Sequence, residues 1–388
     1  MMESADVVII GAGIHGASTA FHLARRGCKV AVVEAKAAGS GATGRSSGLV
    51  RMHYDLAAES ALAWKSFDYF SNWADRVGGD CGFVRTGFIR IVPREREEAL
   101  RANVADQARL GIDTRVVSAA EVGQIAPLLA TDDFDIAAYE PESGYADPTS
   151  ACTSLLGAAR SHGASLYQAC SVATIETTGG RASGVLTAGG RIATNTVVLA
   201  AGAWSGRLAA TAGVGINVCA WHHDTGYLIR PDVDGYGLPT VIDDINELYL
   251  RPEGRSLVLI GLEDGNRIDD TPEDDSANDP AFVDHLVDRV TRRIPSFVDS
   301  RYHGSHGGTD GISADQRPIL GRTTVDGLIL QCGFSGTGFK IAPAVGLAVS
   351  ELILDGCSSS VDISAFDPGR FAAGRPLRGD HPYEAMWR

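Results

Sequence analysis

The sequence predicts an α/β protein that carries a second domain of the α+β class. Residues 6–33 read as strand, helix and strand, which is the βαβ unit of a parallel sheet. Residues 82–147 lose this alternation, and residues 196–202 and 327–354 return to it. We therefore expect a discontinuous first domain and a second domain whose segments fall between its parts.

The first unit begins with a short β-branched run at Asp6–Ile10 that ends in glycines. Apolar residues then recur at helical spacing over Ile14–Arg26, and Lys29–Val33 reads again as a strand. A further helix is expected over Ala57–Val77. Its aromatic residues at three-residue spacing indicate core packing rather than a cofactor contact: Trp64, Phe67, Phe70 and Trp73.

The second domain is expected to begin near residue 82, where a strand at Gly87–Val92 precedes amphipathic helices. Those helices are predicted over Glu95–Leu110 and Ala119–Leu129. A proline starts a helix at Pro148–His162, and glycines predict a hairpin over Gly180–Arg191. Later strands are expected at 226–229, 248–250 and 257–260. The first domain is thus predicted to hold residues 1–81, 148–218 and 309–388, and the second 82–147 and 219–308.

Composition excludes several classes of partner. The formal net charge of −14 disfavours nucleic acid, because phosphate binding depends on Lys and Arg. The seven cysteines contain no CxxC pair, so we expect neither a disulfide framework nor a metal site. No apolar run approaches about 18 residues, and no basic leader with a long apolar stretch precedes Val7. We expect a soluble cytoplasmic protein without a membrane span, and the sequence indicates no oligomeric state.

The glycines after the first strand predict a dinucleotide site. Gly11 allows a tight turn, Gly13 the close approach of a pyrophosphate, and Gly16 close packing of helix on strand. The helix N-terminus offers N–H groups and a positive dipole to the phosphates. Glu34 follows the second strand, where its carboxylate can bind a ribose diol and would repel a 2′-phosphate. The motif therefore predicts FAD or NAD and disfavours NADP.

Two glycine-rich segments favour FAD over NAD. The loop of residues 39–48 carries the hydroxyls of Thr43, Ser46 and Ser47, which can lie along a pyrophosphate and ribityl chain. A flexible surface linker is the alternative interpretation of this loop. The second segment, Gly333–Lys340, joins a strand to an apolar helix. Its Gly336–Gly338 turn can direct backbone N–H groups and a helix dipole at an electron-rich acceptor such as a reduced flavin.

Together with other short segments, these motifs resemble one protein family. The segments are residues 8–16, 45–51, 140–147, 200–205, 314–321 and 333–340. With them the chain resembles the D-amino-acid oxidase-like FAD superfamily, in the branch of sarcosine oxidase, dimethylglycine dehydrogenase and glycine oxidase. The resemblance runs nearly end to end. It implies a Rossmann-like FAD-binding domain and a substrate domain whose mainly antiparallel sheet covers the flavin.

The resemblance implies FAD contacts along these segments. Val172 is expected to meet the adenine through its backbone, and Ala201 and Gly202 to pass close to the cofactor. The expected contacts are Gly11, Gly13, Ile14, His15, Gly16, Glu34, Ala35, Thr43, Arg45, Ser46, Ser47, Leu49, Val172, Ala201, Gly202, Trp204, Gly336, Thr337, Gly338, Phe339 and Lys340.

The resemblance also implies a substrate site. In this branch an arginine at the position of Arg51 and a lysine at that of Lys340 hold the substrate carboxylate. Two such cations can anchor an anion beside a flavin. A structural ion pair for Arg51 and a surface position for Lys340 are the alternative interpretations.

Further residues are candidates for the substrate pocket. Asp310 stands where members of the branch have an aromatic residue. It either faces the pocket, favouring a substrate with a second cationic group, or is a solvated loop residue. Tyr249 and His223 are candidate pocket residues, and so are His222 and His306.

Two departures from the branch concern the flavin. Monomeric sarcosine oxidase-like enzymes attach FAD through a cysteine where this chain has Gly308, and no cysteine lies nearby in the sequence, so we expect noncovalent FAD. Oxidases of the branch keep a lysine on the sheet above the flavin, and this chain has none between Lys65 and Lys340. The electrons therefore pass to oxygen with help from another cation, such as Arg251, Arg255 or a histidine, or to a different acceptor, as in a dehydrogenase.

We expect an FAD-dependent enzyme that oxidises the C–N bond of an amine, or of an N-alkyl or cyclic amino acid. The product is an imine, formed by hydride transfer to flavin N5. Two alternatives stay open. One is an FAD-dependent 2-hydroxy-acid oxidoreductase, which needs a base for the hydroxyl proton, and the other is a non-catalytic FAD-binding subunit.

Overall fold

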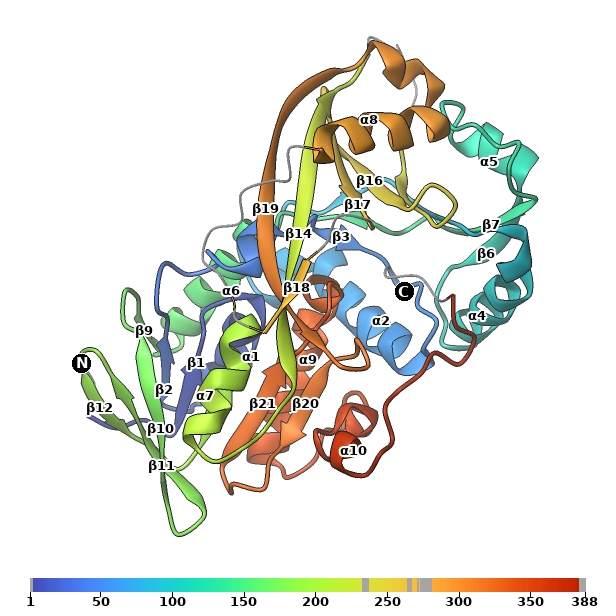
Figure 1. Ribbon diagram of the computed structural model, residues 1–388. Helices are drawn as coiled ribbons and strands as arrows, with labels where there is room; N and C mark the ends of the chain where they lie inside the picture. Colours follow the sequence, from blue (N-terminus) through green and yellow to red (C-terminus); the bar gives the residue numbers. More distant parts are fainter. Residues whose placement is uncertain (1–2, 232–236, 264–266, 271, 273–280, 384–388) are drawn as a thin grey trace.

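A computed structural model of the chain describes residues 3–231, 237–263, 267–270, 272 and 281–383. Two large sheets occupy different halves of the molecule, and two long strands, β14 (Val218–Ile229) and β19 (Arg301–Ser313), run from one half toward the other (Figure 1). Within these ranges, no helix combines the length and the apolar character needed to cross a bilayer.

The first large sheet has six strands in the order β20-β21-β13-β1-β2-β9. Its strands are parallel except for β20, which is antiparallel to β21. Val, Ile and Leu fill the strands because both faces of such a sheet are covered. The α/β prediction is confirmed. The strands are β1 Val7–Ile10, β2 Val30–Val33, β9 Ser165–Tyr167, β13 Val197–Leu199, β20 Ile319–Arg322 and β21 Leu328–Cys332.

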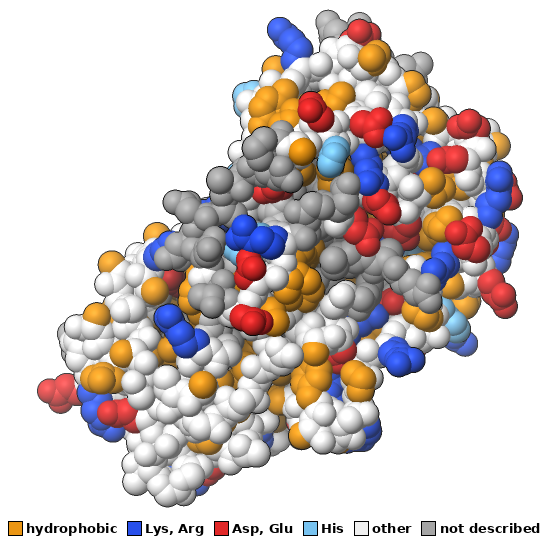
Figure 2. Space-filling view, in the orientation of Figure 1, with side chains coloured by type: hydrophobic (Ala, Val, Ile, Leu, Met, Phe, Trp, Pro, Cys, Tyr) orange, Lys and Arg blue, Asp and Glu red, His pale blue; other side chains and the backbone are white. Residues whose placement is uncertain are grey.

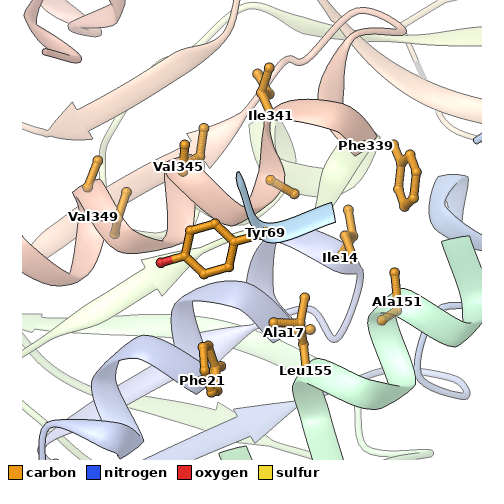
Figure 3. Close-up of a cluster of buried hydrophobic side chains, with 14 of the residues drawn as sticks. Ile14, Ala17, Phe21, Tyr69, Ala151, Leu155, Phe339, Ile341, Val345 and Val349 are labelled. Carbon is orange, nitrogen blue, oxygen red and sulfur yellow. The ribbon is translucent and has the colours of Figure 1, made fainter. Parts of the chain in front are cut away.

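One face of this sheet is covered by helices that pack on α1 (Ile14–Arg25). They are α6 (Pro148–Ser161) and α9 (Gly338–Leu354), and α2 (Ala57–Ser71) packs in turn on α9. Figure 3 shows Ala17, Phe21 and Leu155 meeting in this core. At Gly346 a Cβ atom would lie 2.1 Å from Ser18 Oγ, so glycine lets α1 and α9 approach closely.

The second large sheet has nine strands, and every described pair is antiparallel except β5 with β15. The prediction of a mainly antiparallel second sheet is confirmed. Besides β14 and β19, its strands are β5 Phe88–Ile91, β6 Arg115–Ser118, β7 Ile136–Glu140, β15 Thr240–Asp243, β16 Leu248–Glu253, β17 Leu257–Leu262 and β18 Arg267–Asp269. The helices beside it are α4 Glu97–Arg109, α5 Ala119–Ile125 and α8 Phe282–Arg293 (Figure 1).

The remaining strands form two small sheets. The predicted hairpin is part of the sheet β10 Val172–Thr178, β11 Arg181–Thr187 and β12 Gly190–Ala193. The other joins β3 Leu49–Val50, β8 Gly144–Tyr145 and β4 Val84–Arg85. The remaining helices are short: α3 Trp73–Arg76, α7 Ser205–Thr211 and α10 Gly369–Ala372.

The local structure differs from expectation in four places. The strand expected at 226–229 is the end of the longer β14, and β19 was not expected, because its Gly, His and Ser residues lack apolar alternation. Helix α2 ends at Ser71, before Trp73. Trp64 is exposed, although Phe67, Phe70 and Trp73 are buried as predicted. The division into two domains stays a prediction, and β19 crosses its boundary at residues 308–309.

The described part of the face in Figure 2 carries no broad basic area; acidic and basic side chains lie interspersed over its upper half. All seven cysteines are unpaired, and four of them are buried. Among the described residues, no group of three or more His, Cys, Asp or Glu is arranged to hold a metal ion.

Candidate active site

One cavity of about 440 Å³ is lined by residues from both large sheets. It runs past the ends of β1, β2 and β13, where parallel strands typically meet a nucleotide, to Trp221, Ile242 and Tyr249 of the second sheet. Every residue predicted to contact FAD lines this cavity except Gly16, and so do the substrate-site candidates Arg51, Lys340, Asp310, Tyr249 and His223.

The first glycine turn has the geometry that its motif requires. Gly11 has a φ of +104°, and a Cβ atom there would lie 2.3 Å from the Ala200 carbonyl oxygen. At Gly16 a Cβ atom would lie 2.0 Å from the Gly11 carbonyl oxygen, so this glycine packs helix on turn instead of facing the cavity. Gly13 precedes the first residue of α1, whose N-terminus borders the cavity with Ile14 and His15.

Glu34 stands at the end of β2 and lines the cavity beside Ala35. Its Oε2 accepts the Ala12 N–H at 2.8 Å, and its Oε1 accepts the Lys36 N–H at 2.8 Å. Each carboxylate oxygen can accept a further bond, so a ribose diol is still accommodated. Val172, at the start of β10, lines the same cavity as Glu34 and Ser171.

The loop of residues 39–48 is tied to its neighbours, which argues against a free linker. Thr43 is buried, and its Oγ1 accepts the Ile14 N–H at 2.9 Å. Arg45 Nη1 donates to the Gly307 carbonyl oxygen at 2.5 Å, linking the loop to β19. Arg45, Ser46, Ser47 and Leu49 then continue along the cavity wall.

The second glycine turn differs from its prediction in one respect. Asp310 Oδ2 accepts the Gly336 N–H at 2.8 Å, and Oδ1 accepts the Gly311 N–H at 2.7 Å. The Gly336 amide therefore already has a partner. The donors that α9 leaves without an intrahelical partner are the amides of its first turn, Gly338, Phe339 and Lys340.

Arg51 and Lys340 meet at the far end of the cavity. The Arg51 guanidinium lies 4.3 Å from the centroid of the Tyr54 ring, and Lys340 Nζ lies 5.8 Å from the same centroid. Both side chains are buried. Burial, and then the Arg51 charge, hold the pKa of Lys340 well below its usual range. The surface alternative for Lys340 is therefore wrong.

A buried charge network supports this end. Arg317 donates to Asp55 Oδ1 at 2.7 Å and to Glu59 Oε2. Glu59 Oε1 accepts the Thr337 hydroxyl at 3.4 Å, which joins α2 to the turn before α9. Burial raises the pKa of Glu59, while the Arg317 charge opposes that shift.

Tyr249 and His223 form a pair on the wall contributed by the second sheet. Their hydroxyl and Nε2 atoms lie 2.8 Å apart, and Thr225 Oγ1 lies 3.4 Å from the same hydroxyl. A Cβ atom at Gly261 would lie 2.2 Å from the Tyr249 ring, so glycine allows the ring to lie against its strand. Burial raises the pKa of Tyr249 to about 12.

Four other cationic candidates do not line the cavity, judged over the described residues: Arg251, Arg255, His222 and His306. Arg251 instead donates to the Ser47 carbonyl oxygen and pairs with Glu253 Oε2 at 2.6 Å. His222 Nδ1 lies 3.1 Å from Thr309 Oγ1. Two other histidines, His15 and His223, line the cavity.

Several lining residues were missed by sequence reasoning. Trp221 stands two residues before His223 on β14, a spacing that places both on one face of the strand and was a usable signal. Phe334 stacks on His15 with ring centroids 3.5 Å apart, which no local pattern reveals. The others include Ser171, Arg207, Ile242, Gln331 and Ser335.

These features fit a flavin dinucleotide. The cavity has a glycine turn without room for a Cβ atom, a carboxylate at the end of β2 and helix N-termini at two places. Residues 6–352 match the model of the DAO family, described as FAD dependent oxidoreductase. The chain belongs to this family. The predicted family and FAD cofactor are confirmed.

The chain is similar in sequence to several known members of this family. It is 28% identical to human mitochondrial sarcosine dehydrogenase over 95% of this chain and 42% of the relative. It is also 28% identical to the glycine oxidase of Geobacillus kaustophilus, over 91% of this chain and 94% of the relative. The chain thus spans less than half the length of the sarcosine dehydrogenase.

Solved structures agree with the fold. L-proline dehydrogenase from P. horikoshii superposes with a TM-score of 0.90 at 28% identity, covering 97% of this chain and 100% of the other. Glycine oxidase from Geobacillus kaustophilus gives a TM-score of 0.83 at 26% identity, covering 95% and 99%.

Proposed function

We propose that this chain carries the active site of an FAD-dependent enzyme that oxidises the C–N bond of an amino acid to an imine. The observation that supports it most is the meeting of Arg51 and Lys340 beside Tyr54 in the cofactor cavity. The charges of Glu59 and Asp310 act on Lys340 but do not offset its burial beside Arg51. Two buried basic side chains that converge beside one ring favour an anionic ligand at this position.

In this proposal the two cations bind and orient the substrate carboxylate. Arg51 supplies a planar fork that suits two carboxylate oxygens, and Lys340 adds a point charge. A bound anion would raise the pKa of Lys340 again, since an opposite charge favours the ammonium form. The carboxylate would then hold the substrate in one orientation, which lowers the entropic part of the barrier.

FAD, when bound, supplies N5 as the hydride acceptor. The residues proposed to hold it are those of the two glycine turns, the loop of residues 39–48, Glu34 and Val172. The amides of the first α9 turn are suited to stabilise negative charge on the reduced form. The Tyr249–His223 pair is proposed to border the substrate and exclude water.

We further propose that FAD is bound without a covalent link. At Gly308 a Cβ atom would lie 2.9 Å from Arg45 Cβ, so a cysteine there would require Arg45 to move. No cysteine is among the described residues that line the cavity.

The substrate class is proposed from the relatives. The names of these proteins and of a related 4-methylaminobutanoate oxidase refer to sarcosine, glycine, L-proline and 4-methylaminobutanoate, all small amino acids. We therefore propose an N-alkyl, cyclic or simple amino acid. None of these names favours the 2-hydroxy-acid alternative.

The proposal also covers the electron acceptor, the division of the chain into domains and the cellular location of the protein. We propose a dehydrogenase, because the two arginines named above as helpers of oxygen, Arg251 and Arg255, are not among the described residues that line the cavity. We also propose the two-domain division with the boundaries predicted from the sequence. Seven unpaired cysteines favour the reducing cytoplasm.

The proposal is tested by anaerobic reduction of the purified flavoprotein with a panel of N-methyl, cyclic and D-amino acids, 2-hydroxy acids and simple amines. Bleaching of the oxidised flavin band by at least one amino acid is expected. Bleaching by hydroxy acids alone would support the alternative oxidoreductase. If FAD is bound and no compound reduces it, the non-catalytic subunit becomes the better description.

A further inference from the structure

Arg51 lies on a segment without regular secondary structure, residues 51–55, which follows β3. Since no helix or sheet ladder fixes this segment, its geometry depends on contacts with neighbouring elements. Arg51 Nη1 donates to the His53 carbonyl oxygen, and the guanidinium lies over the Tyr54 ring. The position of Arg51 is therefore set partly by where His53 and Tyr54 are held.

A second segment, residues 377–383, reaches this loop from outside the cavity. The amides of Asp380 and His381 donate to the Asp55 carbonyl oxygen at 2.7 Å and 3.3 Å. Asp380 Oδ2 accepts the Ala57 N–H at 2.9 Å, at the start of α2. Asn103 on α4 donates to the His381 carbonyl oxygen at 2.8 Å. Figure 1 shows this red trace passing from α10 to lie between α2 and α4.

Tyr383 is the last residue of the segment that contacts the 51–55 loop. Its side chain is 3% exposed and packs in a small core with Val92, Leu100 and Val104. The Arg90 guanidinium lies 4.7 Å from the centre of its ring. Its hydroxyl lies 2.7 Å from Nε2 of the fully buried His53. Tyr383 thus binds the same residue whose carbonyl oxygen holds Arg51.

We propose that Tyr383 is a positioning residue for substrate binding: its hydroxyl holds His53, and His53 holds Arg51 in the orientation that receives the substrate carboxylate. This inference rests on the proposed function, which assigns the carboxylate to Arg51. Neither Tyr383 nor His53 lines the cavity, so any effect of Tyr383 on substrate reaches it through Arg51.

The first experiment measures acetate, a minimal carboxylate, binding to the purified FAD-loaded protein through the change in flavin absorbance. Tyr383→Phe keeps the ring and loses one hydrogen bond, so acetate should bind about threefold to tenfold more weakly. The KM for a reactive amino acid should rise by the same factor, with kcat unchanged within about twofold. Tyr69→Phe is the matched control, because Tyr69 is also buried but lies in the core around α1 and α9.

A double-mutant cycle separates a positioning role from general destabilisation. In an Arg51→Lys background, which keeps a cation but loses the planar fork, Tyr383→Phe should weaken acetate binding no further. An unchanged acetate affinity in Tyr383→Phe, or the same loss in both backgrounds, would overturn the inference. Asn103→Ala offers a second variant should Tyr383→Phe fail to retain FAD, with a loss of about twofold expected.

Failure of the proposed function gives a different result. If Arg51→Lys itself leaves acetate affinity unchanged, the assignment of the carboxylate to Arg51 is wrong, and the inference about Tyr383 fails with it. If Arg51→Lys weakens acetate but Tyr383→Phe does not, the inference about Tyr383 fails alone.

Discussion

The two ends of the cavity are built in different ways. The end near Gly11 is shaped by backbone: a positive φ, turns without room for a Cβ atom and the amides at the start of α1. The end near Arg51 is shaped by side chains that come from the 51–55 loop, α9, β14 and β16. At the first end the fold itself fixes the geometry, whereas at the second end each charge needs its own support.

The difference explains what each end contributes. Backbone amides at a helix N-terminus bind any diphosphate, so the first end recognises a cofactor class. Convergent side chains discriminate among substrates, since a single substitution changes what the pocket accepts. The two ends should therefore respond differently to substitution.

Gly11→Ala should have the largest effect of the variants considered. The added Cβ would meet the Ala200 carbonyl oxygen at a φ that alanine rarely adopts. The protein should purify with little FAD, as measured by the ratio of flavin to protein absorbance. Gly157→Ala on α6, where a Cβ atom meets nothing within 4 Å, is the control and should retain FAD. Full FAD occupancy in Gly11→Ala would show that the backbone does not control the cofactor end.

Arg51→Gln should come next. Loss of a buried charged partner typically costs about 2–5 kcal/mol, so kcat/KM for an amino acid should fall roughly 100-fold. FAD content should stay unchanged, which separates this end of the cavity from the other. An amine without a carboxylate serves as the control, and its rate of flavin reduction should change little. Equal losses for both compounds would contradict the carboxylate assignment.

Glu140→Gln tests how the segment that carries Arg51 is stabilised. Glu140 Oε2 accepts the Met52 N–H at 3.0 Å, next to Arg51, and burial raises its pKa from 4.5 to about 7. The folded protein therefore binds this proton more tightly than the unfolded chain does. The contribution to stability is full below about pH 4.5 and is lost as the pH rises toward 7.

The wild-type protein should accordingly lose stability relative to Glu140→Gln between these pH values, by roughly 3 kcal/mol at most. Denaturant unfolding of both proteins at several pH values measures the difference. Parallel curves across this range would mean that Glu140 does not titrate there.

Asp310→Asn should have the smallest effect. Both carboxylate oxygens accept backbone amides, so asparagine keeps one of these bonds and loses the other, at a cost of about 1–2 kcal/mol. Thermal unfolding should register this loss. The preference between neutral and dicationic amino acids should not change. A changed preference would support the hypothesis that Asp310, which lines the cavity, contacts the substrate.

The sequence predicted more of the cavity end near Gly11, which is shaped by backbone, than of the end near Arg51. The strand, turn and helix at residues 6–33 follow from local periodicity and glycine spacing, and the structure agrees. By contrast, β19 carries no apolar alternation, so its pairing with β14 was not foreseen. Arg51 and Lys340 were selected through a family resemblance, since nothing local to either residue predicts that they meet.

Hydrogen bonds between residues far apart in the sequence were the features that the sequence predicted least well. The Gly336 amide was expected to face the cofactor, but Asp310 accepts it, and no sequence pattern links these two positions. The contact between Tyr383 and His53 is of the same kind. Such pairs depend on how elements that are distant in the sequence pack together. Local sequence patterns do not predict that packing.

The central claim is that this cavity binds an amino acid by its carboxylate and oxidises it. Stopped-flow reduction of the bound flavin, without oxygen, is measured with an amino acid of the panel that bleaches the flavin and with the same amine lacking its carboxylate, as L-proline and pyrrolidine do for a cyclic substrate. Reduction by the amino acid that is at least about tenfold more efficient is expected, because only this compound engages Arg51 and Lys340. Equal reduction by both compounds, or more efficient reduction by the amine without a carboxylate, would contradict the claim.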